Sequence, residues 1–319
     1  MADVEINISV MPSVLTVPIT EGEVAPKGVK LDIEKPKSID DLTRRMLTLD
    51  YDLGEMAIST FIDARNRGVR VVGLPIFTSG RRFLQAGFHF SKTSGLEDLS
   101  EIKGRNVGVP QYWMSSSVWQ RSMLQHDYGV GATDVIWVSY QPERGDLKPP
   151  PGVELRFDQS GRDARDLLRA SEIDVSLSTG GGPMGSLDDV ARPVFADRAA
   201  AEREYFQRTG IFPILHVTVM KEDLAEKEPW IAGALCEMYQ QAKSLAQSRE
   251  EPHDSASPGS GETTNQMRAV MGDDPWAFGI GNNRKALDVL VQAAHEQGMT
   301  QRQFAVEELF ARELPDSFR

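Results

Sequence analysis

The chain has 319 residues, of which 40% are hydrophobic and 26% charged, and its formal net charge is −12. This acidic balance argues against a nucleic-acid partner, because no basic face dominates to neutralise phosphates. No run of about 18 apolar residues is long enough to span a membrane, so we expect no membrane partner. A basic start followed by an apolar run is also missing, which favours a cytoplasmic protein. The length favours two lobes over one large core.

Strands alternate with helices through the first half of the sequence, which predicts an α/β sheet with mostly parallel strands. The strands expected there are 6–10, 29–33, 53–59, 69–77 and 83–90, and the helices are 38–49, 61–67 and 97–102. The second half predicts strands at 135–140, 173–177 and 214–220, helices at 163–170 and 200–208, and a mostly helical end. The polar composition of 248–265 is typical of a mobile surface insertion.

The most informative stretch is 104–130, where a short strand at 106–109 stops at Pro110 and a helix begins near 114–117. The first turn of a helix carries unpaired N–H groups and a partial positive charge, so it can seat an anion. Serine-rich helix starts are as often simple caps. The residues of this turn that we expect to contact a ligand are Gln111, Tyr112, Ser115 and Ser116.

The chain is expected to cross between lobes twice, near Pro110 and again near 212–216. Residues 1–109 and 217–319 would then form a first lobe, and 110–216 a second. Ligands of open α/β folds bind beyond the carboxyl ends of strands, and in a two-lobed protein they bind in the cleft between the lobes.

Several segments together resemble one family. They include 53–61, 73–77 with 81–83, 103–110, 209–217, 271–279 and 283–285. The chain resembles the two-lobed type II periplasmic-binding-protein fold and, more narrowly, the 4,5-dihydroxyphthalate decarboxylase family. The Gly-Ile-Phe-Pro-Ile-Leu-His and Gly-Asp-Asp-Pro-Trp pieces are the most specific. The uncharged segment 11–18 and the glycine loop 180–183 depart from the family pattern, where substrate contacts are expected.

The resemblance implies loss of carbon dioxide from a dihydroxylated phthalate to give a dihydroxybenzoate, with no cofactor and a small aromatic carboxylate as the ligand. It leaves open whether the chain forms a homo-oligomer. Arginine matches carboxylate geometry, so Arg81 or Arg82 is expected to hold the carboxylate that is retained. The alternative for such an adjacent pair is a solvated basic surface.

Histidine exchanges protons near neutral pH, and His216 in the second crossover is the first choice for the general acid, with His89 second. A lone strand histidine is otherwise most often structural. Ser59 and Thr60 are expected either to donate to a substrate oxygen or to cap the following helix. Phe212, in the same segment as His216, is expected to contact the substrate. The histidines show no metal-ligand spacing, so the sequence predicts no metal site. The single cysteine, Cys236, is expected to be a buried, inert thiol.

Three functions fit this fold. The leading one is a cofactor-independent decarboxylase of a hydroxylated aromatic acid. The second is a solute-binding protein, cytoplasmic or trimmed from a periplasmic form, for an aromatic or other small carboxylic acid. The third is another carbanion-type enzyme similar to those of the menaquinone futalosine route. Fold alone does not decide among them.

Overall fold

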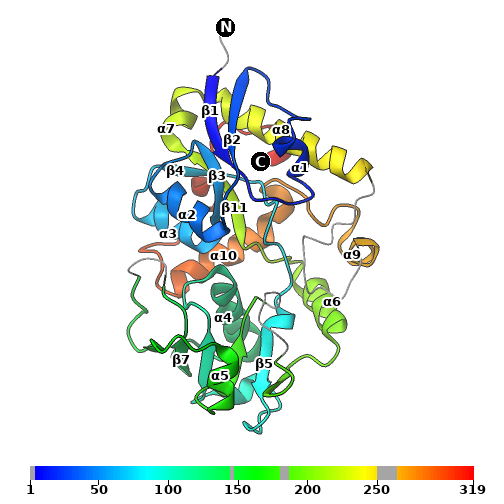
Figure 1. Cartoon of the computed structure of the whole chain (residues 1–319). Helices are drawn as coiled ribbons and strands as arrows, with labels where there is room; N and C mark the ends of the chain where they lie inside the picture. Colours follow the sequence, from blue (N-terminus) through cyan, green and yellow to red (C-terminus); the bar gives the residue numbers. More distant parts are fainter. Residues whose placement is uncertain (1–3, 144–146, 180–186, 250–263) are drawn as a thin grey trace.

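The chain is built on two β-sheets, one in each lobe (Figure 1). The computed structural model describes residues 4–143, 147–179, 187–249 and 264–319. The first sheet has the order β2-β1-β3-β11-β4, and its strands are β1 (Val4–Ser9), β2 (Val29–Glu34), β3 (Leu53–Ala57), β4 (Val71–Leu74) and β11 (His216–Lys221). Only β11 runs antiparallel to its neighbours in this sheet, among the described residues.

The second sheet has the order β10-β5-β9-β6-β7-β8. Its strands are β5 (Phe88–Ser91), β6 (Asn106–Val109), β7 (Ile136–Ser139), β8 (Glu154–Phe157), β9 (Val175–Leu177) and β10 (Ala191–Pro193). Strands β6 to β9 are parallel, whereas β5 is antiparallel to β9 and β10. Both sheets are therefore mixed, and the expected mostly parallel pairing holds except at β5, β10 and β11.

Helices flank both sheets (Figure 1). They are α1 (Val17–Thr20), α2 (Ile39–Leu47), α3 (Ile58–Asn66), α4 (Ser115–Tyr128), α5 (Ala164–Arg169), α6 (Arg198–Thr209), α7 (Glu222–Lys227), α8 (Trp230–Ser248), α9 (Thr264–Met271) and α10 (Arg284–Glu296). No helix in the described ranges is long and apolar enough to cross a membrane. The predicted insertion 248–265 falls mostly on residues outside the described part.

The predicted lobe boundary after residue 109 is wrong. Strands β5 and β6 belong to the second sheet, so the chain leaves the first lobe between β4 and β5. The predicted strand 83–90 explains part of the error, because residues 85–87 form a 3₁₀ turn and only 88–91 pair in a sheet. This strand has the apolar pattern of either sheet, so its sequence alone does not assign it to a lobe. The second crossover precedes β11, as expected.

The two crossover segments pair with each other. Arg81 and Ile214 form an isolated antiparallel bridge, and the Leu215 N–H donates to the Gly80 carbonyl at 3.1 Å. From the second lobe, the Trp119 indole N–H of α4 donates to the Ile214 carbonyl at 2.8 Å. The connection between the lobes is thus a short two-stranded element fastened to α4.

The C-terminal region packs on the first lobe, as predicted. Phe310 pairs with Gly73 of β4, and α8 packs against α1. Helix α10 contacts both α3 and α4, and Figure 1 shows it between the two sheets.

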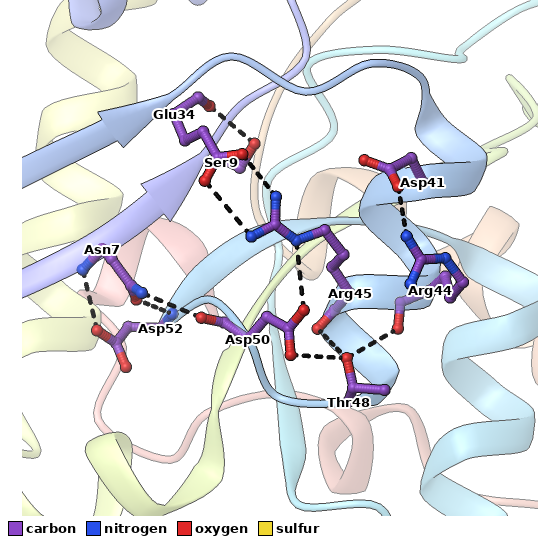
Figure 2. A network of polar contacts seen from close by, with 9 residues as sticks. All are labelled: Asn7, Ser9, Glu34, Asp41, Arg44, Arg45, Thr48, Asp50 and Asp52. Atoms are coloured by element: carbon purple, nitrogen blue, oxygen red, sulfur yellow. Dashed lines mark hydrogen bonds and ion pairs between the residues drawn. The ribbon is translucent and has the colours of Figure 1, made fainter.

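Local sequence sets the start of α2 and its place in the lobe. The Ser38 hydroxyl accepts the Asp41 N–H at 3.1 Å, which caps the helix. Near the end of α2, the Arg45 guanidinium lies 2.6 Å from Glu34 and 3.3 Å from Asp50. Figure 2 shows this arginine joining the end of β2 to the turn that leads into β3. These contacts tie the end of the edge strand β2 to the turn before the central strand β3.

Gly87 is required where the first crossover enters the second sheet. A Cβ at this position would lie 2.0 Å from the Ser178 carbonyl oxygen, a backbone atom that cannot rotate away. We therefore expect Gly87→Ala to lower the free energy of unfolding by about 1–3 kcal/mol. Gly131→Ala is the matched control, because the nearest atom to its Cβ is 3.7 Å away. Denaturant unfolding of both variants checks this, and equal stability of the two would contradict it.

Candidate active site

Strand ends from both sheets meet at the junction of the lobes. Strands β1, β3 and β4 run in one direction and β11 in the other, so three carboxyl ends and one amino end share an edge of the first sheet. The carboxyl ends of β6, β7 and β9 share an edge of the second. Ser59 follows β3 and contacts Ser115, which follows β6, so these two edges face each other.

A partly buried chain of polar groups lies at this junction. The Ser79 hydroxyl oxygen lies 2.5 Å from Oε2 of Glu55 and 2.9 Å from Nδ1 of His216. Thr78 donates to the other Glu55 oxygen at 3.1 Å. Glu55 is on β3, Ser79 is on the first crossover and His216 begins β11, so three separate segments supply this cluster.

Burial dominates the electrostatics of Glu55. Its side chain is 1% exposed, and desolvation raises the pKa of the carboxyl group. The hydroxyls of Ser79 and Thr78 and the N–H of Met11 oppose that rise, because they stabilise the ionised form. The neutral acid is therefore favoured to a higher pH than in a solvated glutamate.

Sequence reasoning missed Glu55 and Ser79. The available signal was an acidic residue in the otherwise apolar strand 53–57, all five of whose residues are buried. A carboxyl group in such a strand is costly unless hydrogen bonds compensate it, so it is seldom there by chance. Ser79 carried no comparable signal, because hydroxyl residues are common in turns.

The predicted serines meet across the lobes. The Ser59 hydroxyl donates to the Trp113 carbonyl at 2.9 Å and lies 3.1 Å from the Ser115 hydroxyl. The Ser59 N–H donates to the same Ser115 oxygen at 3.3 Å. Thr60, the next residue, is half-buried. The starts of α3 and α4 thus point toward each other.

The turn before α4 already holds a carboxylate. The N–H groups of Tyr112 and Trp113 both donate to Glu143, the latter at 3.2 Å, and Ser139 donates to it at 2.8 Å. This arrangement is an anion seat of the predicted kind, occupied by a side chain of the protein itself. The Gln111 amide donates to the Pro142 carbonyl in the same loop.

Two of the predicted contacts in this turn are buried. The Tyr112 ring is covered by the Arg121 guanidinium, whose central carbon lies 3.7 Å from the ring centroid. Ser116 is 1% exposed, and its hydroxyl has no hydrogen-bond partner within the part of the chain that the structure describes. These side chains build the wall behind the start of α4.

The two candidate arginines differ in their surroundings. Arg81 is buried, donates to the carbonyls of Phe212 and Ala277, and lies 4.8 Å from the centroid of the Phe212 ring. Arg81 and Phe212 line a cavity of about 470 Å³ that also includes the start of α10. Arg82 is half-buried, and desolvation lowers the pKa of its guanidinium.

The remaining predictions concern side chains outside the cluster. His89 lies within β5, and burial lowers the pKa of its ring. No described contact joins it to Glu55, Ser79 or His216. The described residues include no group of three His, Cys, Asp or Glu side chains placed to hold a metal ion. Cys236 is buried, as expected, and burial raises the pKa of its thiol to about 12.

Solved structures with similar folds include sulfonate-binding proteins. The periplasmic SsuA of Methylobacillus flagellatus KT matches with a TM-score of 0.56 at 13% identity, covering 100% of this chain and 93% of that one. The aliphatic sulphonate-binding SsuA of Escherichia coli gives 0.52 at 12%, covering 96% and 91%. The desulfurization enzyme DSZB gives 0.50 at 17%, covering 99% and 97%. These likenesses confirm the predicted two-lobed, periplasmic-binding-protein-like α/β fold, and at such identities they show the fold alone.

Sequence comparison is more specific. No family model matches the chain. A protein of Pseudomonas putida named 4,5-dihydroxyphthalate decarboxylase is 30% identical over 186 residues, which cover 56% of this chain and 71% of that protein. A protein of Comamonas testosteroni with the same name is 30% identical over 319 residues, covering 95% of this chain and 94% of the relative. Since this match spans nearly all of both proteins, the chain belongs to the 4,5-dihydroxyphthalate decarboxylase family, a family of carboxy-lyases.

Proposed function

We propose that this chain removes a carboxyl group, as carbon dioxide, from a hydroxylated aromatic carboxylic acid at the junction of its lobes, without a cofactor. Both named relatives point to a ring with two hydroxyl and two carboxyl groups as the substrate class. The observation that carries the proposal is the place of His216. It lies where both crossovers and the central strand meet, with Nδ1 held by Ser79.

The reaction needs a proton donor and a ring that supplies electrons. The donor's proton forms a new C–H bond at the ring carbon that bears the carboxylate, and the hydroxyl groups supply electron density to that carbon. The carbon–carbon bond then breaks, its electron pair returns to the ring, and carbon dioxide leaves. The net change replaces carbon dioxide by a proton, so no oxidant or reductant is required.

His216 suits the role of donor. Histidine is the side chain whose proton exchange falls near neutral pH. Because Ser79 contacts Nδ1, transfer to a substrate uses Nε2 of this ring. The Ser79 contact also restrains the ring orientation, which a positioned acid requires.

Arg82 is the proposed anchor for the carboxylate that remains on the ring. A guanidinium that burial has partly desolvated gains more from a carboxylate than a fully exposed one does. Ser115, whose hydroxyl accepts the Ser59 N–H and lies 3.1 Å from the Ser59 hydroxyl, is the proposed donor to a ring oxygen. Arg81 instead donates to the Phe212 carbonyl of the second crossover and to the Ala277 carbonyl of the C-terminal region.

Carbon dioxide release from a panel of hydroxybenzoic and phthalic acids tests the function directly. We expect release from a dihydroxylated phthalate, and we expect His216→Gln to lower kcat by about 10²–10⁴-fold, because the general acid is lost. Ligand binding, measured by calorimetry, should persist in that variant. His126→Gln is the control, since His126 is an exposed residue of α4 that pairs with Glu296.

Two results would contradict this. If the wild-type protein binds aromatic acids tightly and releases no carbon dioxide, the chain is a solute-binding protein. If His216→Gln turns over normally, another group donates the proton.

Substitution of Arg82 tests the anchor. We expect Arg82→Ala to weaken binding of aromatic diacids by about 10–100-fold, the worth of a charge-assisted hydrogen bond. Monoacids should lose much less, because they lack the second carboxylate. The exposed Arg44 of α2, paired with Asp41, provides the control substitution. An equal loss for monoacids and diacids would refute the anchor role.

A further inference from the structure

We propose that Glu55, acting through Ser79, is a positioning residue that sets which ring nitrogen of His216 carries a proton. The inference rests on the proposed role of His216 as proton donor. It assigns a function to the buried carboxyl group of Glu55, which takes no direct part in the decarboxylation of the substrate.

The geometry makes a continuous chain of three groups. Ser79 Oγ is 2.5 Å from Glu55 Oε2 and 2.9 Å from His216 Nδ1, both within hydrogen-bond range. A hydroxyl can donate to one neighbour while it accepts from the other. The protonation state of Glu55 is therefore coupled through Ser79 to the protonation state of His216. A Cβ at Gly80 would lie 2.5 Å from His216 Nδ1, so only glycine leaves room for the ring at this point.

The chain holds one shared proton in either of two arrangements. With Glu55 ionised, Ser79 donates to the carboxylate, Nδ1–H donates to Ser79, and the imidazolium presents Nε2–H. With Glu55 neutral, its O–H donates to Ser79, Ser79 donates to Nδ1, and the neutral ring again presents Nε2–H. Both forms contain the same number of protons, and in both Nε2 carries the one to be transferred.

Transfer to the substrate has the same outcome from either arrangement. When Nε2 gives up its proton, the ring ends neutral with Nδ1–H, and Glu55 ends ionised. Starting from neutral Glu55, its proton moves to Ser79 as the Ser79 proton moves to Nδ1. An imidazolate is thus avoided, and the carboxyl group serves as the proton reserve for the ring.

The surroundings of Glu55 support this role. The groups that face it are Thr78 and Ser79 from the crossover, the Met11 N–H from the loop after β1, Thr218 opposite it on β11, and Tyr239 from α8. The hydrogen-bond donors to the carboxyl group are Thr78, Ser79 and the Met11 N–H, and no cation is among these neighbours. Burial raises the pKa of Glu55 towards the range in which histidine titrates. Glu55 therefore binds a proton more readily than a solvated carboxylate does, and it can exchange that proton with His216.

The test measures His216 without turnover. Full-length protein with ¹⁵N-labelled histidine is titrated by NMR, and the ring nitrogen shifts report both the tautomer and the pKa. The chain has five histidines, and His216→Gln identifies the signal. We expect Glu55→Gln and Ser79→Ala each to lower the pKa of His216 by about one unit or more, because the imidazolium loses its stabilising partner.

Kinetics provide the second readout. In both variants we expect kcat to fall by about tenfold or more while KM changes by less than about threefold, since the substrate contacts remain. Asp63→Asn is the control, because Asp63 is also a buried carboxyl group of the first lobe but pairs with Arg67. Its effect on the pKa of His216 should be absent.

The proposal is overturned if folded Ser79→Ala or Glu55→Gln leaves both the pKa and the tautomer of His216 unchanged, whatever happens to stability. Ser79→Ala keeps the test decisive if Glu55→Gln fails to fold. If the wild-type protein releases carbon dioxide and the pKa of His216 is unchanged in the variants, this inference is overturned and the proposed decarboxylase function stands. Absence of release from the wild-type protein would overturn the proposed function, and the NMR titration would still decide the coupling.

Discussion

The polar cluster of Thr78, Ser79 and His216 at the junction of the lobes depends on one carboxyl group placed inside an apolar strand. Burying Glu55 in the centre of the first sheet is unfavourable unless hydrogen bonds compensate it, and the donors come from segments far apart in the sequence. Thr78 and Ser79 can reach it only when the first crossover turns back over the end of β3. The fold and the cluster therefore stabilise each other.

The paired crossovers give this cluster its precision. The Leu215 N–H is bonded to the Gly80 carbonyl, so the residues on either side of that bond, Ser79 and His216, are held in register. A side chain carried by two hydrogen-bonded segments is positioned better than one on a loop, and a proton donor needs such positioning. The same pair of segments links the lobes, so a movement of one lobe relative to the other would shift the position of His216.

The local sequence pattern predicted most of the helices and strands. It also singled out Ser59, Ser115 and His216, which lie at the junction of the lobes. Strand β6 begins and ends where expected, and Ser38 caps α2. The lobe boundary failed because an apolar strand such as β5 fits either sheet, and pairing is set by contacts distant in sequence. Glu55 and Ser79 were missed for a related reason, since their proximity exists only after the crossover folds.

The carboxylate seat before α4 bears on how an acidic protein handles an acidic ligand. Glu143 accepts from the N–H groups of Tyr112 and Trp113, so the most favourable place for an anion in this turn is filled from within. A ligand that entered this seat would exchange one carboxylate for another, with little net gain in charge stabilisation. The seat therefore adds little affinity for an acidic ligand, because its N–H donors are already used by Glu143.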